Sequence, residues 1–306
     1  MPLSWSVVGA PRSLRRTLAA HQSGFGDPTT HIGDREFRRA TFTPHGPGTL
    51  RLRWTVDPAD PAESGLDAQA WGPGADWLLD GVESLTGSED RAVQFVGAHP
   101  MVDRALRVRR TTRFGASHGL YHQLLPTVIA QRITGGEALH QWAALCRALG
   151  STPPGPTEAV GGLVLPPDPE VLRRRPLWWF HPLGIEGHRA ATLVECARHA
   201  DKMWRWSPHE AASKLPLLRG VGPWTVGSVL GPVYGDADAV AVGDYHYPNI
   251  VAYALAREPR ADDARMLDLL EPYEGQRGRV LRDLVTTAGP APSFGPRQRI
   301  LPMSRW

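Results

Sequence analysis

One stretch of the sequence combines a glycine-rich turn that could hold a phosphate with a large aromatic ring. The segment LRGVGPWT, residues 218–225, places Gly220 and Gly222 directly before Pro223 and Trp224. Glycine adopts backbone angles closed to other residues, and proline fits the first position of a helix. We therefore expect a helix, a two-glycine hairpin and a second helix. Amides at the start of that second helix would point outward with little bulk before them, which suits a phosphate.

A carboxylate follows this hairpin in the chain. An ordinary tight helix–helix connection has the same glycine pattern, so the hairpin alone does not establish a site. Asp244 comes after a short extended segment that follows Gly235, with Pro248 close behind. This order predicts Asp244 as a helix N-cap, where amide dipoles favour its ionised form. Such a carboxylate can stabilise the positive charge that develops on a sugar when a glycosidic bond breaks. Asp236 and Asp238 are rival carboxylates, which we interpret as solvated turn residues.

The elements that must position these residues fall into two regions. Residues 37–43 and 49–56 alternate like two strands, and residues 76–85 have helical spacing. From about residue 94 the pattern is helical. We predict an α+β fold in which a small antiparallel β-sheet domain, residues 1–93, precedes a mainly α-helical domain, residues 94–306.

Apolar residues recur with helical period in four segments of the second region: residues 121–134, 137–149, 187–204 and 264–273. Ser207, Pro208 and Glu210 have the pattern of a capping box with proline at the first helical position. A further helix should begin there and run toward Leu218. Residues 151–176 are rich in proline and glycine and predict a connecting loop.

The composition limits the chemistry. The formal net charge of +3 is compatible with a polyanionic partner. Two cysteines, Cys146 and Cys196, without a CxxC pair exclude a disulfide framework and a cysteine-ligated zinc or iron–sulfur site. This cysteine use indicates a reducing compartment. The N-terminus lacks the order of a signal peptide and no long apolar window occurs, so we expect a cytoplasmic protein without membrane contact.

His118 and His122 have the i, i+4 spacing of a metal-binding pair. No third ligand or HExxH glutamate accompanies them, and Gly119 weakens a helix there. We expect surface or capping roles for these histidines, and no metal site.

Residues 115 to 287 resemble a known family, the helix-hairpin-helix DNA glycosylases with a glycine/proline-rich loop and a following aspartate. The most similar branch is that of 3-methyladenine DNA glycosylase II. LRGVGPWT resembles its hairpin, and Asp244, 20 residues after Trp224, stands at the place of the catalytic aspartate. YHQLLPTVIAQRIT, residues 121–134, is similar to a helix that ends in glutamine and a residue pushed into DNA. PLGIEGHRAATLVECA, residues 182–197, resembles the glycine-containing turn and the helix after it.

The resemblance assigns the catalytic carboxylate and the phosphate grip. It implies that Asp244 is catalytic and that the backbone of Gly220, Val221 and Gly222 holds a DNA phosphate. In this family a monovalent cation often binds nearby carbonyls, here those of Leu218 and Val221. We expect no other cofactor.

The resemblance also assigns residues to the base and to the opened duplex. Trp224 and Tyr245 would line the base pocket, Gln131 would face the opened duplex, and Arg132 would fill the hole left by the flipped base. The chain departs from the family pattern at three places: Arg219 replaces a common proline, Pro216 interrupts the preceding helix, and Arg132 is larger than an aliphatic plug. These departures bear on the local fit of DNA.

Two arginines beside these segments are candidates for phosphate contacts: Arg219, in the hairpin, and Arg189, in the predicted helix 187–204.

These residues predict a monofunctional DNA glycosylase of base excision repair. The enzyme would flip a base from double-stranded DNA and hydrolyse its glycosidic bond, leaving an abasic site. Purines such as 3-methyladenine and 7-methylguanine carry positive charge, which an electron-rich ring attracts. Glycosylases that also nick the strand carry a lysine on the first turn after the hairpin, where this chain has Trp224. We expect a monomer without lyase activity.

Two alternative functions remain open. A glycosylase for oxidised or deaminated bases would release such bases and no methylated ones. A non-catalytic helix-hairpin-helix DNA-binding protein would be indifferent to the substitution Asp244→Asn.

Overall fold

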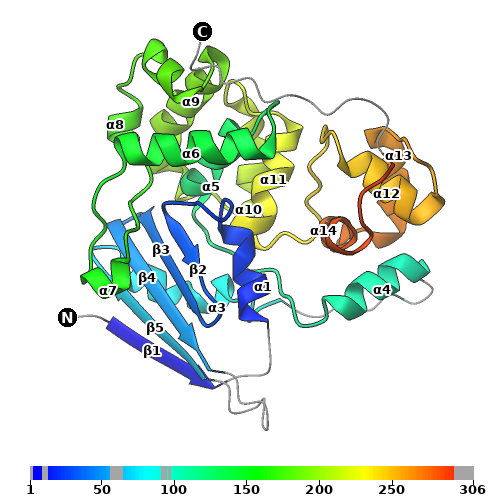
Figure 1. Cartoon of the computed structure of the whole chain (residues 1–306), viewed down its shortest axis with the longest axis horizontal. Coiled ribbons are helices and arrows are strands. Elements are labelled where there is room, and N and C mark those ends of the chain that lie inside the picture. Colours follow the sequence, from blue (N-terminus) through cyan, green and yellow to red (C-terminus); the bar gives the residue numbers. More distant parts are fainter. Residues whose placement is uncertain (1–2, 9–12, 56–64, 91–94, 96–97, 293–306) are drawn as a thin grey trace.

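A five-stranded antiparallel sheet occupies one end of the molecule (Figure 1). The computed structural model describes residues 3–8, 13–55, 65–90, 95 and 98–292. The sheet order is β1-β5-β4-β3-β2, with β1 at Leu3–Val8, β2 at Thr30–Ile32, β3 at Glu36–Thr43, β4 at Gly46–Trp54 and β5 at Gly65–Trp71. The two predicted strands correspond to β3 and β4, and position 56 lies outside the described residues.

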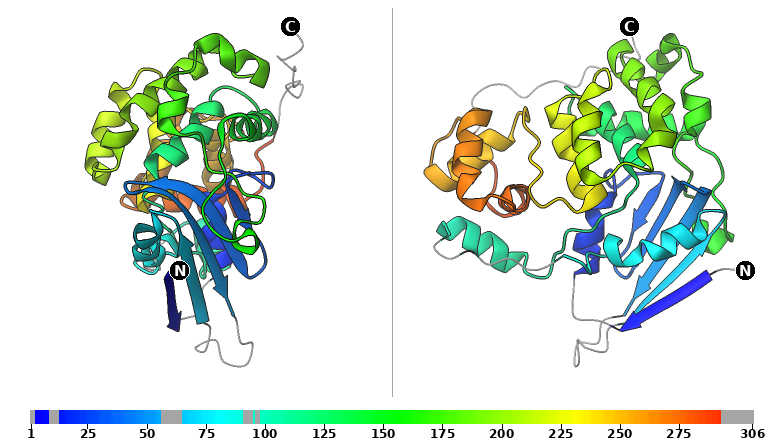
Figure 2. Two further views of the ribbon diagram at one scale, coloured as in Figure 1. Left: turned by 90° about the vertical axis from the view of Figure 1, so that its left-hand side faces the viewer. Right: turned by 180° about the vertical axis from the view of Figure 1, so that it is seen from behind.

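Alternation of side chains along β4 builds the core of the sheet. Leu50, Leu52 and Trp54 are buried on one face, where Leu78 and Val82 cover them. Leu78 and Val82 belong to α2 (Ala75–Asp80) and α3 (Val82–Leu85), which lie along this face (Figure 2). The single helix predicted for residues 76–85 is therefore two short helices, divided at Gly81.

Helices form two further groups (Figure 1). The first group shares one core and comprises α5 (Leu120–Ile129), α6 (Gly135–Leu149), η3 (Leu177–Leu183), α9 (Gly187–Met203), α10 (Pro208–Lys214), η4 (Leu215–Leu217) and α11 (Pro223–Tyr234). The second comprises α4 (Pro100–Val108), α12 (Tyr247–Ala256), α13 (Asp263–Leu270), η5 (Glu271–Tyr273) and α14 (Arg277–Thr287). The predicted α+β class is confirmed.

The connection between α6 and η3 has more structure than a bare loop. It carries α7 (Thr157–Val160) and α8 (Pro169–Leu172), and its Leu163 and Leu165 pack against Ala40 of β3. This segment therefore covers part of the sheet as well as linking two helices.

Polar contacts join the sheet to the first helical group. The ring of His122 in α5 hydrogen-bonds the hydroxyls of Thr29 and Thr41, at 3.0 and 2.9 Å. Trp142 in α6 donates its indole N–H to Asp27 at 3.0 Å. His122 is 4% exposed, so the expectation that it lies at the surface is wrong.

His118, four residues before His122 in the chain, hydrogen-bonds the Ser84 hydroxyl. Within the described residues no group of three or more potential ligands surrounds a metal position, and no helix is long and apolar enough to cross a membrane. The predicted domain boundary at residue 93 falls outside the described residues.

Candidate active site

The helix before the hairpin begins as its sequence predicts. Ser207 accepts a hydrogen bond from the Glu210 amide at 3.2 Å, and Glu210 accepts one from the Ser207 amide at 3.0 Å, which completes a capping box. The helix α10 ends at Lys214, short of the predicted Leu218, and Pro216 lies in the 3₁₀ turn η4. Proline has no N–H to continue an α-helix, so the tighter turn carries the chain into the hairpin.

Gly220 occupies a position that other residues would not fit. Its φ is +88°, and a Cβ there would lie 2.0 Å from the Thr192 hydroxyl in α9. The amide of Val221 closes the turn by donating to the Leu218 carbonyl at 3.0 Å. The hairpin backbone can therefore press directly against α9.

Gly222 differs from Gly220 in its backbone and its surroundings. It is extended, with φ −105° and ψ −178°, so the expectation that it too needs glycine angles is wrong. No atom lies within 4 Å of where its Cβ would be. The start of α11 at Pro223 therefore faces open space, with its first amides unsatisfied by an earlier turn. The helix ends, as predicted, at Gly235 in the left-handed region.

Gln131 holds the hairpin in place through two hydrogen bonds. Its amide nitrogen donates to the Gly220 carbonyl at 3.0 Å and to the Thr225 hydroxyl at 2.9 Å. The helix α5 ends at Ile129, before the predicted limit at residue 134, and Arg132 has φ +59°, which is uncommon outside glycine. Arg132 is exposed beside the hairpin that Gln131 holds.

Asp244 accepts hydrogen bonds at both carboxylate oxygens. Oδ1 accepts from the amides of His246 and Tyr247 at 2.8 and 3.0 Å, and Oδ2 accepts from the indole Nε1 of Trp224 at 3.0 Å. The backbone N-cap of α12 is His246, two residues later than predicted, although the Asp244 side chain still caps the first amides. The half-buried carboxylate is thus fixed between α11 and α12 by three N–H donors.

The chain reaches Asp244 through another turn. Gly243 has φ +95°, and its amide donates to Asp263 of α13 at 3.0 Å. A carboxylate of the second helical group therefore sets the loop that carries Asp244. Thr225, Thr192 and Asp263 thus support the site without a sequence motif of their own; only the place of Thr225 directly after Trp224 could have drawn attention to it.

The two aromatic residues predicted for the base pocket differ in their exposure and in their contacts. Trp224 is half-buried with its indole edge on Asp244. Tyr245 is 84% exposed and packs edge-on against His246 with ring centroids 5.0 Å apart. The cavity lined by Arg109 and the small cavity lined by Arg39 do not reach Trp224, Tyr245 or Asp244. The base-pocket role of both aromatics stays a prediction.

Arg189 is placed where it cannot contact DNA. It is 2% exposed, and its guanidinium donates to the Ile129 carbonyl and to Gln141 Oε1, both at 2.7 Å. The predicted phosphate contact is therefore wrong, because this arginine satisfies buried acceptors of α5 and α6. Arg219, in contrast, is exposed at the hairpin.

The rival carboxylates, Asp236 and Asp238, make hydrogen bonds and an ion pair of their own. Asp238 makes a two-oxygen ion pair with Arg277 and accepts its amide at 2.9 Å, and Asp236 accepts the amide of Asp238. Partial burial opposes ionisation of Asp238, but the hydrogen bonds from Arg277 outweigh it and lower its pKa. Asp238 therefore anchors the start of α14 and is not the freely solvated residue expected.

The fold is shared with known DNA glycosylases. The 3-methyladenine DNA glycosylase from Archaeoglobus fulgidus superposes with a TM-score of 0.70 at 15% identity, over 92% of this chain and 97% of that one. The Clostridium acetobutylicum 8-oxoguanine glycosylase/lyase, in complex with DNA containing 8-oxoguanine opposite cytosine, superposes with a TM-score of 0.63 at 12% identity, over 93% and 96%. No family model and no curated protein matches the sequence. The chain therefore has the fold of these glycosylases, at a sequence distance that identifies the fold alone.

Proposed function

We propose that this protein is a DNA glycosylase that excises alkylated purines from double-stranded DNA by hydrolysis, with Asp244 as the catalytic carboxylate. The observation that carries the proposal is the hydrogen bond from Trp224 to Asp244 beside an open hairpin. It joins a fixed carboxylate, an aromatic ring and the open space before Gly222 within one short part of a glycosylase fold. The A. fulgidus neighbour, named as a 3-methyladenine glycosylase, has this fold over nearly its whole length.

The geometry of Asp244 suits the departure of a base. Breaking an N-glycosidic bond leaves positive charge on the sugar, and a positioned carboxylate stabilises that charge most when it does not have to reorient. Two backbone amides and the Trp224 indole hold both oxygens of Asp244, so little reorientation remains. The same carboxylate orients the attacking water.

The hairpin and Arg132 suit the DNA around the lesion. The amides that follow Gly222 face open space and would hold a phosphate next to the flipped nucleotide. Exposed Arg132 would enter the duplex and fill the gap left by the base. A monovalent cation on the carbonyls of Leu218 and Val221 would strengthen the grip on the phosphate.

The lysines support hydrolysis without strand cleavage. Trp224 stands on the first turn of α11, where a Schiff-base lysine would be needed. Lys214 is paired with Glu210 at 2.7 Å and lies over the ring of Trp206, while Lys202 is exposed in α9. Both lysines precede the hairpin in the chain and lie outside the first turn of α11.

The proposal is tested by base release from methylated duplex DNA. We expect the wild-type protein to free 3-methyladenine or 7-methylguanine and to leave the strand uncut until heat or alkali is applied. Asp244→Asn should lower the single-turnover rate by about 100-fold or more while binding persists. Asp201→Asn, an exposed aspartate of α9, is the matched control. Absence of release by the wild type, or equal rates for the two variants, would overturn the proposal.

A second candidate is a glycosylase for oxidised bases. It is favoured by the likeness to the C. acetobutylicum protein, whose structure holds DNA with 8-oxoguanine. The same assay with an 8-oxoguanine duplex separates the two functions by which base is released. Hydrolysis is the expected route for either base, because no lysine stands on the first turn after the hairpin.

A further inference from the structure

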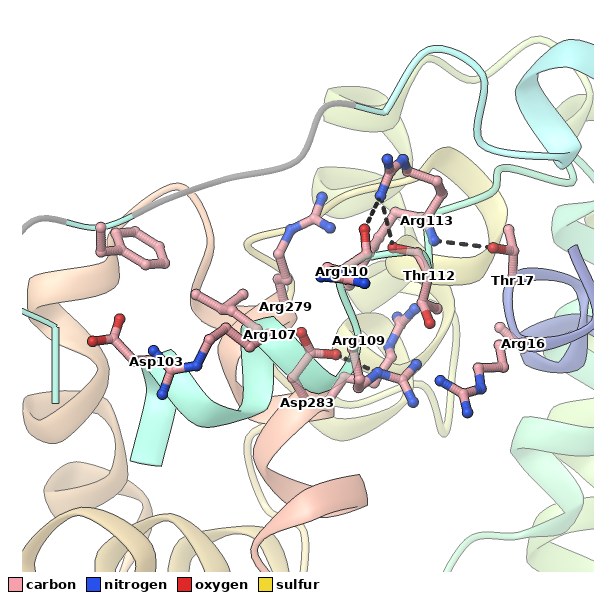
Figure 3. Close-up of a pocket in the computed structure, with 15 residues that line it drawn as sticks. Arg16, Thr17, Asp103, Arg107, Arg109, Arg110, Thr112, Arg113, Arg279 and Asp283 are labelled. Atoms are coloured by element: carbon pink, nitrogen blue, oxygen red, sulfur yellow. Dashed lines mark hydrogen bonds and ion pairs between the residues drawn. The ribbon is translucent and has the colours of Figure 1, made fainter. Parts of the chain in front are cut away.

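A cavity of about 510 Å³ lies between α1 (Leu14–Leu18), the end of α4 and the first half of α14 (Figure 3). This volume falls in the range of roughly 300–1,000 Å³ typical of small-molecule sites. Seven of the fifteen residues that line it are arginines. A cavity with this many guanidinium groups in its wall is suited to an anion.

The carboxylates around the cavity neutralise only part of this charge. Arg109 pairs with Asp283 at 2.6 Å, and Arg279 pairs with Asp90. Asp283 and Asp103 line the cavity, and Asp90 lies outside the lining. Seven arginines against three carboxylates leave an excess of four positive charges. The arginines that make no ion pair within the described part of the chain are Arg16, Arg107, Arg110, Arg113 and Arg282.

Two arginines are stacked at the inner wall. The guanidinium carbons of Arg282 and Arg279 lie 4.0 and 4.4 Å from the centroid of the Phe114 ring. Burial lowers the pKa of Arg282 to about 10, so this arginine stays protonated at neutral pH. Phe114 and the carbonyl end of α11 near Gly231 partly stabilise this charge.

Among the lining arginines without an ion pair, only Arg282 has its charge stabilised in this way. Arg16 extends from α1, and Arg107, Arg110 and Arg113 belong to the end of α4 and the segment after it, yet all four line the same cavity. Arg113 donates to backbone carbonyls at 2.7 and 3.4 Å, which directs its guanidinium without neutralising it. These four cations, from α1 and from the segment 107–113, converge with Asp103 as the one unpaired carboxylate of the lining among the described residues, so the cavity keeps a positive charge that an added anion would offset.

The cavity is separate from the hairpin. Arg282 approaches Gly231 near the C-terminal end of α11, whereas the hairpin precedes the N-terminal end of that helix. The nine residue steps from Gly222 to Gly231 span roughly 13 Å at about 1.5 Å per residue. One phosphate cannot occupy both places.

We propose that this arginine-lined cavity binds a phosphate group of a second ligand. Guanidinium forks match pairs of phosphate oxygens, and several of them can bind one phosphate ester from different sides. The phosphate comes either from a free nucleotide, which the volume accommodates, or from a DNA strand that continues beyond the hairpin. This binding does not depend on the proposed base excision.

The test uses thymidine 5′-monophosphate and thymidine as probes, measured by calorimetry at low salt. The pocket variant Arg107→Gln/Arg110→Gln removes two exposed lining arginines that make no ion pair. The control variant Arg104→Gln/Arg147→Gln removes two exposed arginines outside the lining. We expect the monophosphate to bind, thymidine not to bind, and the pocket variant alone to weaken the monophosphate by at least about tenfold.

Undamaged duplex DNA identifies the source of the phosphate. If the pocket variant also weakens the duplex and lowers the salt dependence of binding by about two, the cavity serves a DNA phosphate. If duplex binding is unchanged, the cavity serves a free nucleotide. Equal binding of monophosphate and thymidine by the wild type, or equal monophosphate affinity in the two variants, overturns the proposal. Base release from methylated DNA, measured on the same variants, reports separately on the proposed glycosylase.

Discussion

The indole of Trp224 does more at this site than offer a ring face. Its N–H donates to one oxygen of Asp244, so the aromatic residue on the first turn of α11 also positions this carboxylate. A change from tryptophan to phenylalanine keeps an aromatic face and removes only this donor. The two contributions of Trp224 can therefore be separated.

We expect Trp224→Phe to lower the rate of base release by about tenfold, because one lost hydrogen bond of about 1.4 kcal/mol corresponds to that factor. Single-turnover kinetics on methylated duplex DNA measures it. Trp178→Phe, at an exposed tryptophan of η3, should behave as wild type. An unchanged rate in Trp224→Phe would mean that the backbone amides alone position Asp244.

The two hairpin glycines should differ in how much an alanine substitution lowers the free energy of unfolding. Gly220→Ala places a methyl group in the left-handed region and against Thr192, so we expect a loss of about 2–4 kcal/mol in the free energy of unfolding. Gly222→Ala should change stability by less than about 0.5 kcal/mol, because its backbone is extended and its surroundings are open.

Urea denaturation and duplex binding together test this pair. The methyl group of Gly222→Ala would stand before the first amides of α11, so we expect weaker DNA binding in a fully stable protein. Equal stability of the two alanine variants would contradict the strained position of Gly220.

At the scale of elements, α9 supports the site through a buried arginine. Arg189 donates to the carbonyl of Ile129, the last residue of α5, and to Gln141 of α6. Gln131, two residues after Ile129, donates to the hairpin at Gly220. In the sequence, Arg189 was a candidate for a phosphate contact. The long side chain of an arginine in an otherwise regular helix does not reveal whether its charge faces water or buried carbonyls.

Arg189→Met should lower the free energy of unfolding by about 3–5 kcal/mol, since it leaves buried acceptors without donors. Arg198→Met, at an exposed arginine of the same helix, should cost less than about 0.5 kcal/mol. Chemical denaturation of both variants measures the difference. A mild effect at Arg189 would show that water satisfies these acceptors.

At the scale of the molecule, buried His122 connects the sheet to the first helical group, and His21 is buried as well. Burial, and then the charge of Arg39, lowers the pKa of His21 and of His122 well below its usual value. The unfolded chain therefore binds more protons than the folded one below about pH 6.5. The stability contributed by these neutral histidines is complete above that pH and is lost as the pH falls.

We expect the free energy of unfolding to fall steeply between pH 6.5 and 5. His122→Gln should reduce this slope by up to about 1.4 kcal/mol per pH unit, because one titrating group is removed from the joint between sheet and helices. Exposed His140→Gln is the control. Denaturation curves at several pH values give the slopes, and parallel slopes for wild type and His122→Gln would refute this role for His122.

The sequence by itself determined the local parts of this protein. The capping box at Ser207, the start of α11 at Pro223, the C-cap at Gly235 and the turn into Asp244 all depend on backbone preferences of a few adjacent residues. The two strands β3 and β4 followed from the alternation of side chains, which needs no knowledge of the partner strands.

Only the tertiary structure decided which side chains meet. Gln131 lies 89 positions from the carbonyl it holds, and Arg279 lies 189 positions from Asp90. No periodicity records such distances. The roles of Arg189 and of His122 were settled by burial, because the same charged or polar side chain is solvated on one face of a helix and must find partners on the other.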